Sequence, residues 1–241
     1  MNMVFKYCGW RARIGLVMPG NGTNPEHEFH KYAPEGVTVV TQRVLFERVD
    51  PKGLKEMGDR VDEVAKLLAT AHPDIILFGC TSGSLIQGFG YDQEIIKRIE
   101  DKTGIRALTT SSAVISALQA LNAKRLVVST PYVDSVNDIE KKFLEDSGFE
   151  VLCIKGLQNL DPDLMPRTSL QEMYHLTKSV LRDEADTIFV SCTGLGIVHG
   201  INMMERDFGR PLVTSNQASL WGALRALSIR DDVGLGKLFT L

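Results

Sequence analysis

"DIILFGCTSG" at residues 74–83 and "DTIFVSCTGL" at residues 186–195 are two copies of one sequence motif. Each begins with an aspartate, continues as a short apolar run and ends at a cysteine that polar residues follow. Cys80 and Cys192 stand 112 residues apart, and segments 13–19 and 125–131 keep the same offset. A shared offset across two strand–loop units indicates an internal duplication.

Short apolar runs alternate with helix-like segments along the whole chain. Helical spacing of apolar residues is clearest at 53–71 and 169–183. Strands are expected at residues 13–19, 37–46, 74–80, 105–110, 125–131, 149–156, 186–193 and 211–216. Apolar strands that alternate with helices predict an α/β protein with parallel sheets covered on both faces.

Both cysteines fall at predicted strand ends, where open parallel sheets bind their ligands. Pro19 and Pro131 lie at two further strand ends. If the duplicated halves face each other, Cys80 and Cys192 meet in one cleft. Helix-like sequence follows each cysteine, and a helix N-terminus lowers a thiol pKa from its usual value of about 8.5. Free N–H groups in such turns also bind a substrate carboxylate.

Two opposed thiols can perform two kinds of isomerisation. One takes a proton from one face of a carbon while the other returns a proton to the opposite face, which is racemisation. Alternatively, a thiolate adds to an activated double bond, the bond rotates, and elimination gives the other geometric isomer. Two buried structural cysteines are the alternative interpretation, but matched positions in a repeat favour the chemistry.

The composition excludes several classes of function. The chain has 241 residues, of which 44% are hydrophobic and 24% charged, as in ordinary globular proteins. A net charge of −3 gives no basic surface, so no nucleic-acid partner is predicted. The apolar runs are too short to span a bilayer, so no membrane partner is predicted. No secretory signal pattern is visible at the N-terminus, which favours a cytoplasmic protein.

No metal or organic cofactor is predicted. The four cysteines contain no CxxC pair, and the five histidines are scattered without metal-ligand spacing. Two glycine-rich loops, at 20–25 and 194–200, each break the G-x-G-x-x-G nucleotide fingerprint at its third glycine. Glu26, His27, Glu28 and His30 form a polar cluster near the end of the first strand. It is either a solvated loop or a group that gates or orients substrate.

The chain resembles the aspartate/glutamate racemase superfamily, in the branch that contains maleate cis-trans isomerase and arylmalonate decarboxylase. The residues that carry the resemblance are "RIGLVMP" (13–19), "TTSSAVISALQALNAKRLVVSTPYVDSVND" (109–138), "VSCTGL" (190–195), "FGRPLVTS" (208–215) and "LWGALRAL" (220–227). The resemblance implies two flavodoxin-like parallel-sheet lobes, related by a pseudo-twofold axis, with the active site in the cleft between them. It implies a C-terminal helix that returns to the first lobe, so the lobes are expected to be 1–112 plus 217–241, and 113–216.

The resemblance also implies a site for a substrate carboxylate. Cys192 matches the single catalytic cysteine of the decarboxylases and the second cysteine of the racemases and isomerases. Thr81 and Ser82 match a pair that hydrogen-bonds the carboxylate, and Tyr132 matches a tyrosine of the same pocket. The backbone N–H of Thr193 is expected to complete it, although the decarboxylases have glycine there.

Cys80 is the informative departure from the decarboxylases, which have glycine at this point, whereas racemases and maleate isomerases have cysteine. Maleate isomerases also hold their substrate with asparagines. Asn21 and Asn24 are the candidates for that contact in the first loop, but neither is in register without a shift.

These observations predict a cofactor-independent, two-cysteine isomerase or racemase of the maleate isomerase type, acting on a small mono- or dicarboxylate. One alternative is an arylmalonate-type decarboxylase that uses Cys192 as proton donor. An alternative of another class is a two-lobed sensor that binds a small carboxylate without catalysis. The expected partner is the small-molecule carboxylate itself, and the oligomeric state is left open, a homo-oligomer included.

Overall fold

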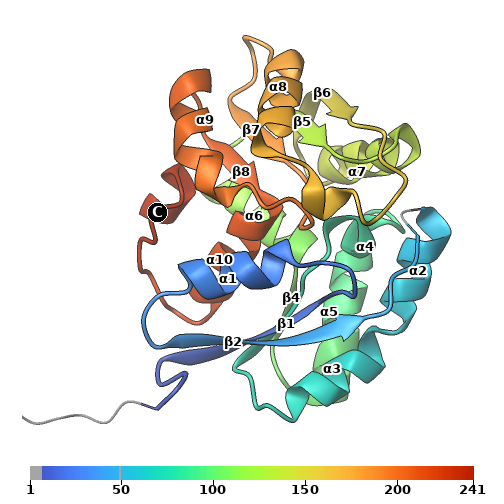
Figure 1. Ribbon diagram of the computed structural model, residues 1–241, viewed down its shortest axis with the longest axis vertical. Helices are drawn as coiled ribbons and strands as arrows, with labels where there is room; N and C mark the ends of the chain where they lie inside the picture. Colours follow the sequence, from blue (N-terminus) through green and yellow to red (C-terminus); the bar gives the residue numbers. More distant parts are fainter. Residues whose placement is uncertain (1–6, 49) are drawn as a thin grey trace, which may run out of the picture.

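The computed structural model, which describes residues 7–48 and 50–241, contains two parallel sheets of four strands. The strand orders are β2-β1-β3-β4 and β6-β5-β7-β8, so the second half of the chain repeats the topology of the first. Figure 1 shows the first sheet in the lower half of the molecule and the second in the upper half. The predicted α/β fold of two parallel-sheet lobes is therefore confirmed.

Every strand expected from the sequence overlaps an observed strand. The strands are β1 (Ala12–Pro19), β2 (Val37–Val44), β3 (Ile75–Phe78), β4 (Ala107–Thr109), β5 (Arg125–Thr130), β6 (Glu150–Gly156), β7 (Thr187–Val190) and β8 (Leu212–Thr214). The inner strands β3 and β7 are buried at every residue. They are apolar on both faces because helices cover both faces of each sheet.

The helices fill the connections between the strands. They are α1 (Asn24–Tyr32), α2 (Pro51–Asp59), α3 (Val61–Ala69), α4 (Thr81–Leu85), α5 (Tyr91–Thr103), α6 (Thr110–Ala120), α7 (Asp134–Asp146), α8 (Leu170–Val180), α9 (Ile201–Phe208) and α10 (Ser215–Ala226). Three short 3-10 turns are η1 (Met165–Arg167), η2 (Val198–Gly200) and η3 (Lys237–Thr240).

Two predicted helices differ from the observed ones. The segment 53–71 forms two helices, because the chain turns at Arg60, whose φ of −89° and ψ of 0° lie outside the regular helix. Gly58, just before this turn, packs against the Tyr91 hydroxyl, where any larger residue would collide. The segment 169–183 ends early, at Val180, since Leu181 has extended backbone angles.

The repeated aspartates perform the same task in both halves. Asp74 accepts a hydrogen bond from the backbone N–H of Arg13 at 2.7 Å, and Asp186 accepts one from the N–H of Arg125 at 2.9 Å. Each aspartate thus ties the start of an inner strand to the start of its neighbour. Because neighbouring strands of each sheet begin in register, their carboxyl ends, one of which leads into the cysteine, lie together at one edge of that sheet.

Helices α6 and α10 form the seam between the two sheets. They pack against each other, and each begins with a capping box that a threonine provides, Thr109 in α6 and Thr214 in α10. Helix α10 is buried from Ser215 to Leu224 and contacts β3 and β4 of the first sheet as well as β8 of the second. The division into residues 1–112 plus 217–241 and 113–216 stays a prediction.

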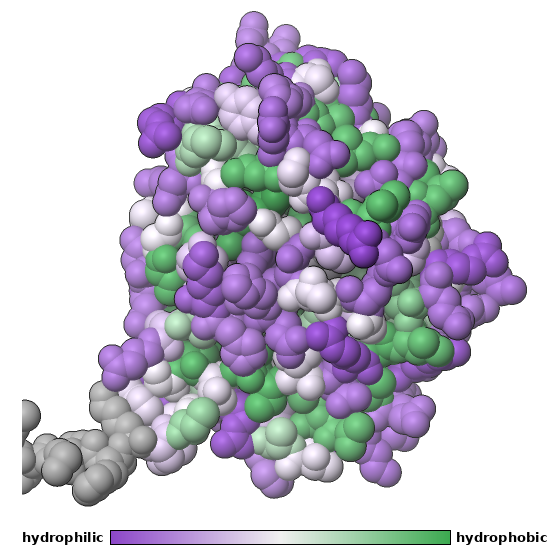
Figure 2. All heavy atoms as spheres, viewed as in Figure 1, coloured by the Kyte–Doolittle hydropathy of each residue, from purple (hydrophilic) through white to green (hydrophobic). Residues whose placement is uncertain are grey.

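The surface is of mixed polarity. Figure 2 shows hydrophilic side chains over most of one face, with apolar side chains in small groups between them. Within residues 7–48 and 50–241, no helix has the length and apolar character that crossing a membrane requires.

Candidate active site

A small cavity lies where the carboxyl ends of the inner strands of the two sheets meet. Its water-accessible volume is about 30 Å³, roughly enough for two water molecules. The polar and thiol side chains of its lining are those of Asn21, Cys80, Ser82, Tyr132, Cys192 and Thr193. The two cysteines therefore reach one cavity from matching positions of the duplicated fold, and both are free thiols.

Cys80 is the N-cap residue of α4. Its backbone is extended, with φ −145° and ψ 116°, and its Sγ accepts a hydrogen bond from the N–H of Gly83 at 3.4 Å. A Cβ at position 83 would lie 2.9 Å from this sulfur, so the close approach of helix and thiol requires glycine. The first turn of α4 thus directs a backbone N–H at the sulfur, in the way that a polar N-cap side chain is normally held.

Cys192 occupies a strained turn. Its φ of 123° lies in a region that residues with a side chain seldom adopt. Its Sγ accepts a hydrogen bond from the N–H of Gly194 at 3.2 Å and lies 3.8 Å from Sδ of Met165. The helix expected directly after this cysteine is absent, because the next helical residues begin only at η2. A tight turn, not a helix N-terminus, therefore supplies the N–H here.

The thiol pKa values run opposite to the expectation from the sequence. Burial raises the pKa of Cys80 to about 11 and that of Cys192 to about 12. The hydrogen bonds from Gly83, from Gly194 and from the Tyr132 hydroxyl lower these pKa values, but by less than burial raises them. With these pKa values both cysteines are neutral thiols at neutral pH, so each is a potential proton donor.

The two cysteine turns are tied to each other through the hydroxyls that follow them. Thr81 donates through Oγ1 to Oγ of Ser215 at 2.8 Å. This Ser215 oxygen also accepts a hydrogen bond from the backbone N–H of Cys192 at 3.0 Å. In the reverse direction, Oγ1 of Thr193 donates to the carbonyl of Gly79 at 3.3 Å. These reciprocal bonds account for the threonine after each cysteine: it fixes the separation of the two sulfur-bearing turns.

The comparisons with known proteins agree with this geometry. The family described as arylmalonate decarboxylase matches residues 14–239. The chain belongs to this family. It is similar to the maleate isomerase of Pseudomonas putida, with 24% identity over 242 residues, which cover 95% of this chain and 97% of the relative. It is also similar to the arylmalonate decarboxylase of Bordetella bronchiseptica, with 27% identity over 195 residues and coverage of 79% and 81%.

A solved structure has the same fold over nearly the whole length. It is a cysteine-to-serine mutant of the Nocardia farcinica maleate cis-trans isomerase, with a TM-score of 0.90, 22% identity, and coverage of 95% of this chain and 98% of that one. The resemblance drawn from the sequence, to the branch of maleate isomerase and arylmalonate decarboxylase, is confirmed.

In this member of the arylmalonate decarboxylase family, two of the predicted substrate-binding residues are not in the cavity lining. Thr81 is buried and directs its hydroxyl to Ser215. Asn24 donates its amide to the carbonyls of Gly194 at 2.7 Å and Pro166 at 3.1 Å. Both side chains hold the walls of the site rather than its interior. For the residues that do line the cavity, the catalytic and binding roles stay predictions.

The first loop brings Asn21 to the mouth of the cavity. Its amide donates to Oδ1 of Asp163 in the opposite lobe at 3.4 Å. Phe46, Pro162 and Met165 add an apolar wall. No sequence signal marks these residues, because Phe46 follows β2, Pro162 lies in a loop and Met165 begins η1, outside the repeated motif. The cavity is thus lined by thiols and polar groups together with apolar side chains.

The polar cluster near the first strand end divides into two kinds of residue. His27 and His30 are exposed, and Glu26 forms a surface ion pair with Arg43 at 2.7 Å. Glu28 is buried, with only 5% of its surface exposed. The cluster lies on α1, so the loop expected here is wrong. The two histidines and Glu26 are solvated, as that interpretation predicted, but Glu28 is not.

Glu140, on α7, is a further buried carboxyl that the sequence analysis missed. It is fully buried, and its Oε1 accepts a hydrogen bond from Oγ of Ser191, the residue before Cys192, at 2.5 Å. Burial raises its pKa to about 7. One glutamate in an otherwise ordinary amphipathic helix gives no sequence signal, because its burial is decided only when α7 packs on the second sheet.

Replacing Glu140 with glutamine is expected to flatten the pH dependence of stability. A carboxyl whose pKa is raised from 4.5 to about 7 on folding stabilises the protein below the unfolded pKa, and this stability is lost as pH rises through 7. For one such group the free energy of unfolding falls by about 2 kcal/mol between about pH 5.5 and about pH 8. Glutamine keeps the bond from Ser191 and does not titrate.

Urea denaturation at the two pH values measures this difference. The Glu140→Gln variant retains the contribution of Glu28, whose pKa burial also raises to about 7. Its free energy of unfolding should therefore fall about half as much between the two pH values as that of the wild type. A variant with the full wild-type pH dependence would show that Glu140 is not the titrating group.

No group of three or more His, Cys, Asp or Glu side chains that could hold a metal ion occurs among the residues that the structure describes. Cofactor-independent chemistry stays a prediction.

Proposed function

We propose that this protein is a cofactor-independent cis-trans isomerase of the maleate isomerase type, acting on a small unsaturated dicarboxylate. The observation that carries the proposal is the position of Cys80 and Cys192, two free thiols that line one cavity from equivalent strand ends. The similarity to the Pseudomonas putida maleate isomerase over 95% of the chain supports it. The Nocardia farcinica enzyme with this fold holds a covalently bound succinylcysteine intermediate, which is the kind of adduct that a thiol route requires.

The proposed reaction begins with the thiolate of Cys80. Its sulfur adds to one carbon of the double bond, and the neighbouring carbon takes the proton of the Cys192 thiol. The product is a saturated adduct on Cys80, in which the former double bond rotates freely. The Cys192 thiolate then removes a proton from the same carbon, the sulfur–carbon bond breaks, and the trans double bond forms. Cys80 leaves as thiolate and Cys192 as thiol, as at the start.

We assign the addition to Cys80 because of its place at the start of α4. The backbone N–H groups in the first turn of a helix stabilise a thiolate, and Gly83 directs one at this sulfur. Burial raises the pKa of Cys80 to about 11, so its thiolate has to form before the addition, by loss of the proton to water, and the N–H of Gly83 then stabilises the sulfur anion. Burial raises the pKa of Cys192 to about 12, so this thiol stays protonated at neutral pH and still carries the proton that the addition uses.

The remaining lining residues supply what a carboxylate needs. Ser82, Tyr132 and the backbone of Thr193 offer hydrogen-bond donors, and Asn21 offers an amide at the mouth. The apolar wall around Met165 excludes water, which strengthens these hydrogen bonds and protects the carbanion-like centre from adventitious protonation. The substrate is the small-molecule partner that we propose.

Four free cysteines fit a reducing compartment, and we propose a cytoplasmic site of action.

Proton NMR in D₂O, with maleate, aspartate, hydantoins and arylmalonates supplied separately, tests the proposal. We expect maleate to give fumarate, without CO₂. Loss of CO₂ from an arylmalonate with no change in maleate would instead support the decarboxylase, the alternative favoured by the 27% identity to the Bordetella bronchiseptica enzyme. Binding of these carboxylates with no change in any of them would support the sensor.

A further inference from the structure

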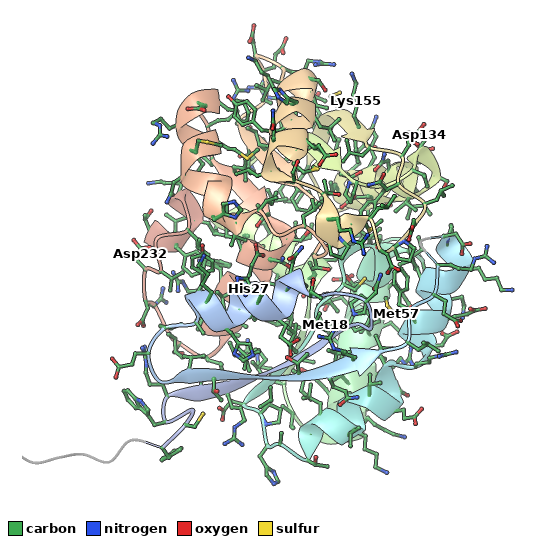
Figure 3. The ribbon with its side chains drawn as sticks, in the orientation of Figure 1. Met18, His27, Met57, Asp134, Lys155 and Asp232 are labelled. Carbon is green, nitrogen blue, oxygen red and sulfur yellow. The ribbon has the colours of Figure 1, made fainter. Side chains whose placement is uncertain are left out.

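Helix α1 reaches across the cleft to the segment that follows Cys192. In Figure 3 this helix, which carries the labelled His27, crosses between the two sheets. Asn24 donates its amide to the carbonyl of Gly194 at 2.7 Å and to that of Pro166 at 3.1 Å. A Cβ at Gly196 would lie 2.8 Å from the Asn24 side chain, so helix and segment are in direct contact and a larger residue cannot enter.

One turn further along α1, Glu28 binds the far end of the same segment. Its Oε1 accepts from the backbone N–H of Val198 at 3.1 Å, and its Oε2 accepts from the amide of Asn216 at 2.6 Å. The same amide nitrogen donates to the carbonyls of Thr193 at 3.0 Å and Leu195 at 3.2 Å. The side chains of Asn24, Glu28 and Asn216 thus bind the backbone of residues 193–198 at four positions, Thr193, Gly194, Leu195 and Val198.

Gly194 is where this network meets the reacting sulfur. Its N–H donates to Sγ of Cys192 at 3.2 Å, while its carbonyl is held by Asn24. The φ of 123° at Cys192 is strained, and strain of this kind persists only where the surroundings fix the backbone firmly. The three side chains provide that restraint from outside the strand.

We propose that Asn24, Glu28 and Asn216 form a clamp that fixes segment 193–198 and thereby holds Cys192 in its reactive position. They are positioning residues: none of the three lines the cavity, and they act through the backbone of the Cys192 turn. The effect on turnover rests on the proposed function, whereas the effect on the segment does not.

A carboxylate suits the clamp because it accepts from two donors at once. Glutamine at position 28 would keep the shape but place an NH₂ group against either the Val198 N–H or the Asn216 amide. One hydrogen bond is lost and two donors are forced together. Above pH 7, where Glu28 is mostly ionised, bonds to this charged group contribute about 1.5–3 kcal/mol, so segment 193–198 should become locally mobile in the variant.

The test compares Glu28→Gln with Glu26→Gln, a matched control on the same helix whose carboxylate forms only the surface ion pair with Arg43. Hydrogen–deuterium exchange, read by mass spectrometry, should show exchange in 193–200 at least ~10-fold faster in Glu28→Gln, with β3 and β5 unchanged. On a confirmed substrate, kcat should fall about 10-fold with KM within about twofold. The control should match the wild type in both measurements.

Exchange in 193–200 that equals the wild type would overturn the clamp. A uniform increase across both sheets would also overturn it, because it would indicate general destabilisation. If Glu28→Gln does not fold, Asn24→Ala carries the same test, since it removes only the bonds to Gly194 and Pro166. Local exchange that rises as expected in a protein that turns over no carboxylate would uphold the clamp and reject the proposed function.

Discussion

Cys192→Ala is expected to lower isomerase turnover by at least ~10²-fold, the usual scale for loss of an acid/base group. Alanine removes the proton donor and leaves the backbone of the turn, which Ser215 still holds through the N–H of residue 192. The substitution keeps Cβ and therefore adds no new requirement on the strained backbone. Circular dichroism should show a folded protein, and denaturation a stability loss of about 0.5–1.5 kcal/mol, because the N–H of Gly194 loses its sulfur acceptor.

Cys80→Ala should give a loss of at least the same size, because the nucleophile itself is removed. It also leaves the N–H of Gly83 without its sulfur acceptor, so a stability loss of about 0.5–2 kcal/mol is expected, as for other lost N-caps. Steady-state kinetics on a confirmed substrate measure the first effect and urea denaturation the second.

The two cysteine variants also differ in what they trap. With substrate added, Cys192→Ala keeps the nucleophile. Water can supply the missing proton slowly, and no Cys192 thiolate is left to remove it again, so intact-mass spectrometry should detect a covalent adduct, whereas Cys80→Ala should form none. An adduct in Cys80→Ala and none in Cys192→Ala would reverse the assigned roles. Full turnover in Cys80→Gly, with CO₂ as the product from an arylmalonate, would show that one cysteine suffices and that the protein is a decarboxylase.

Tyr132→Phe is expected to lower catalytic efficiency about 10- to 100-fold. The side chain is almost fully buried, with 1% of its surface exposed, so phenylalanine preserves its packing and removes only the hydroxyl. A hydrogen bond to a charged group contributes about 1.5–3 kcal/mol, and each 1.4 kcal/mol corresponds to about a factor of ten. Steady-state kinetics on a confirmed substrate should show the loss.

A second measurement separates the role of this hydroxyl from a purely structural one. The Tyr132 hydroxyl lowers the pKa of the Cys192 thiol, so in Tyr132→Phe that pKa should rise. Alkylation of Cys192 by iodoacetamide, followed over pH in a Cys80→Ala background, should become slower at a given alkaline pH. Kinetics and alkylation equal to those of the parent proteins would remove Tyr132 from the site.

The repeated motif by itself determined most of the architecture. Each copy places an aspartate at the start and a cysteine at the end of a buried strand, and period and composition suffice to predict parallel sheets. The duplication then requires that Cys80 and Cys192 occupy equivalent ends. These features are local or periodic, so they can be predicted from the sequence before the packing of the other helices and strands is known. Family membership followed from the same segments and is confirmed by the match over residues 14–239.

What surrounds the sulfurs was decided only by the tertiary structure. Burial raises both thiol pKa values, whereas a helix N-terminus after each cysteine was expected to lower them. The sequence does not show this, because desolvation of the thiols depends on how the two lobes pack together. Asn24 follows the first strand as a substrate ligand would, yet it binds backbone across the cleft. Partners such as Ser215 stand more than a hundred residues from Thr81, and no pattern within either segment encodes their distance. The sequence fixes which residues stand at the strand ends, but packing between lobes determines their solvation, their hydrogen bonds and so their chemistry.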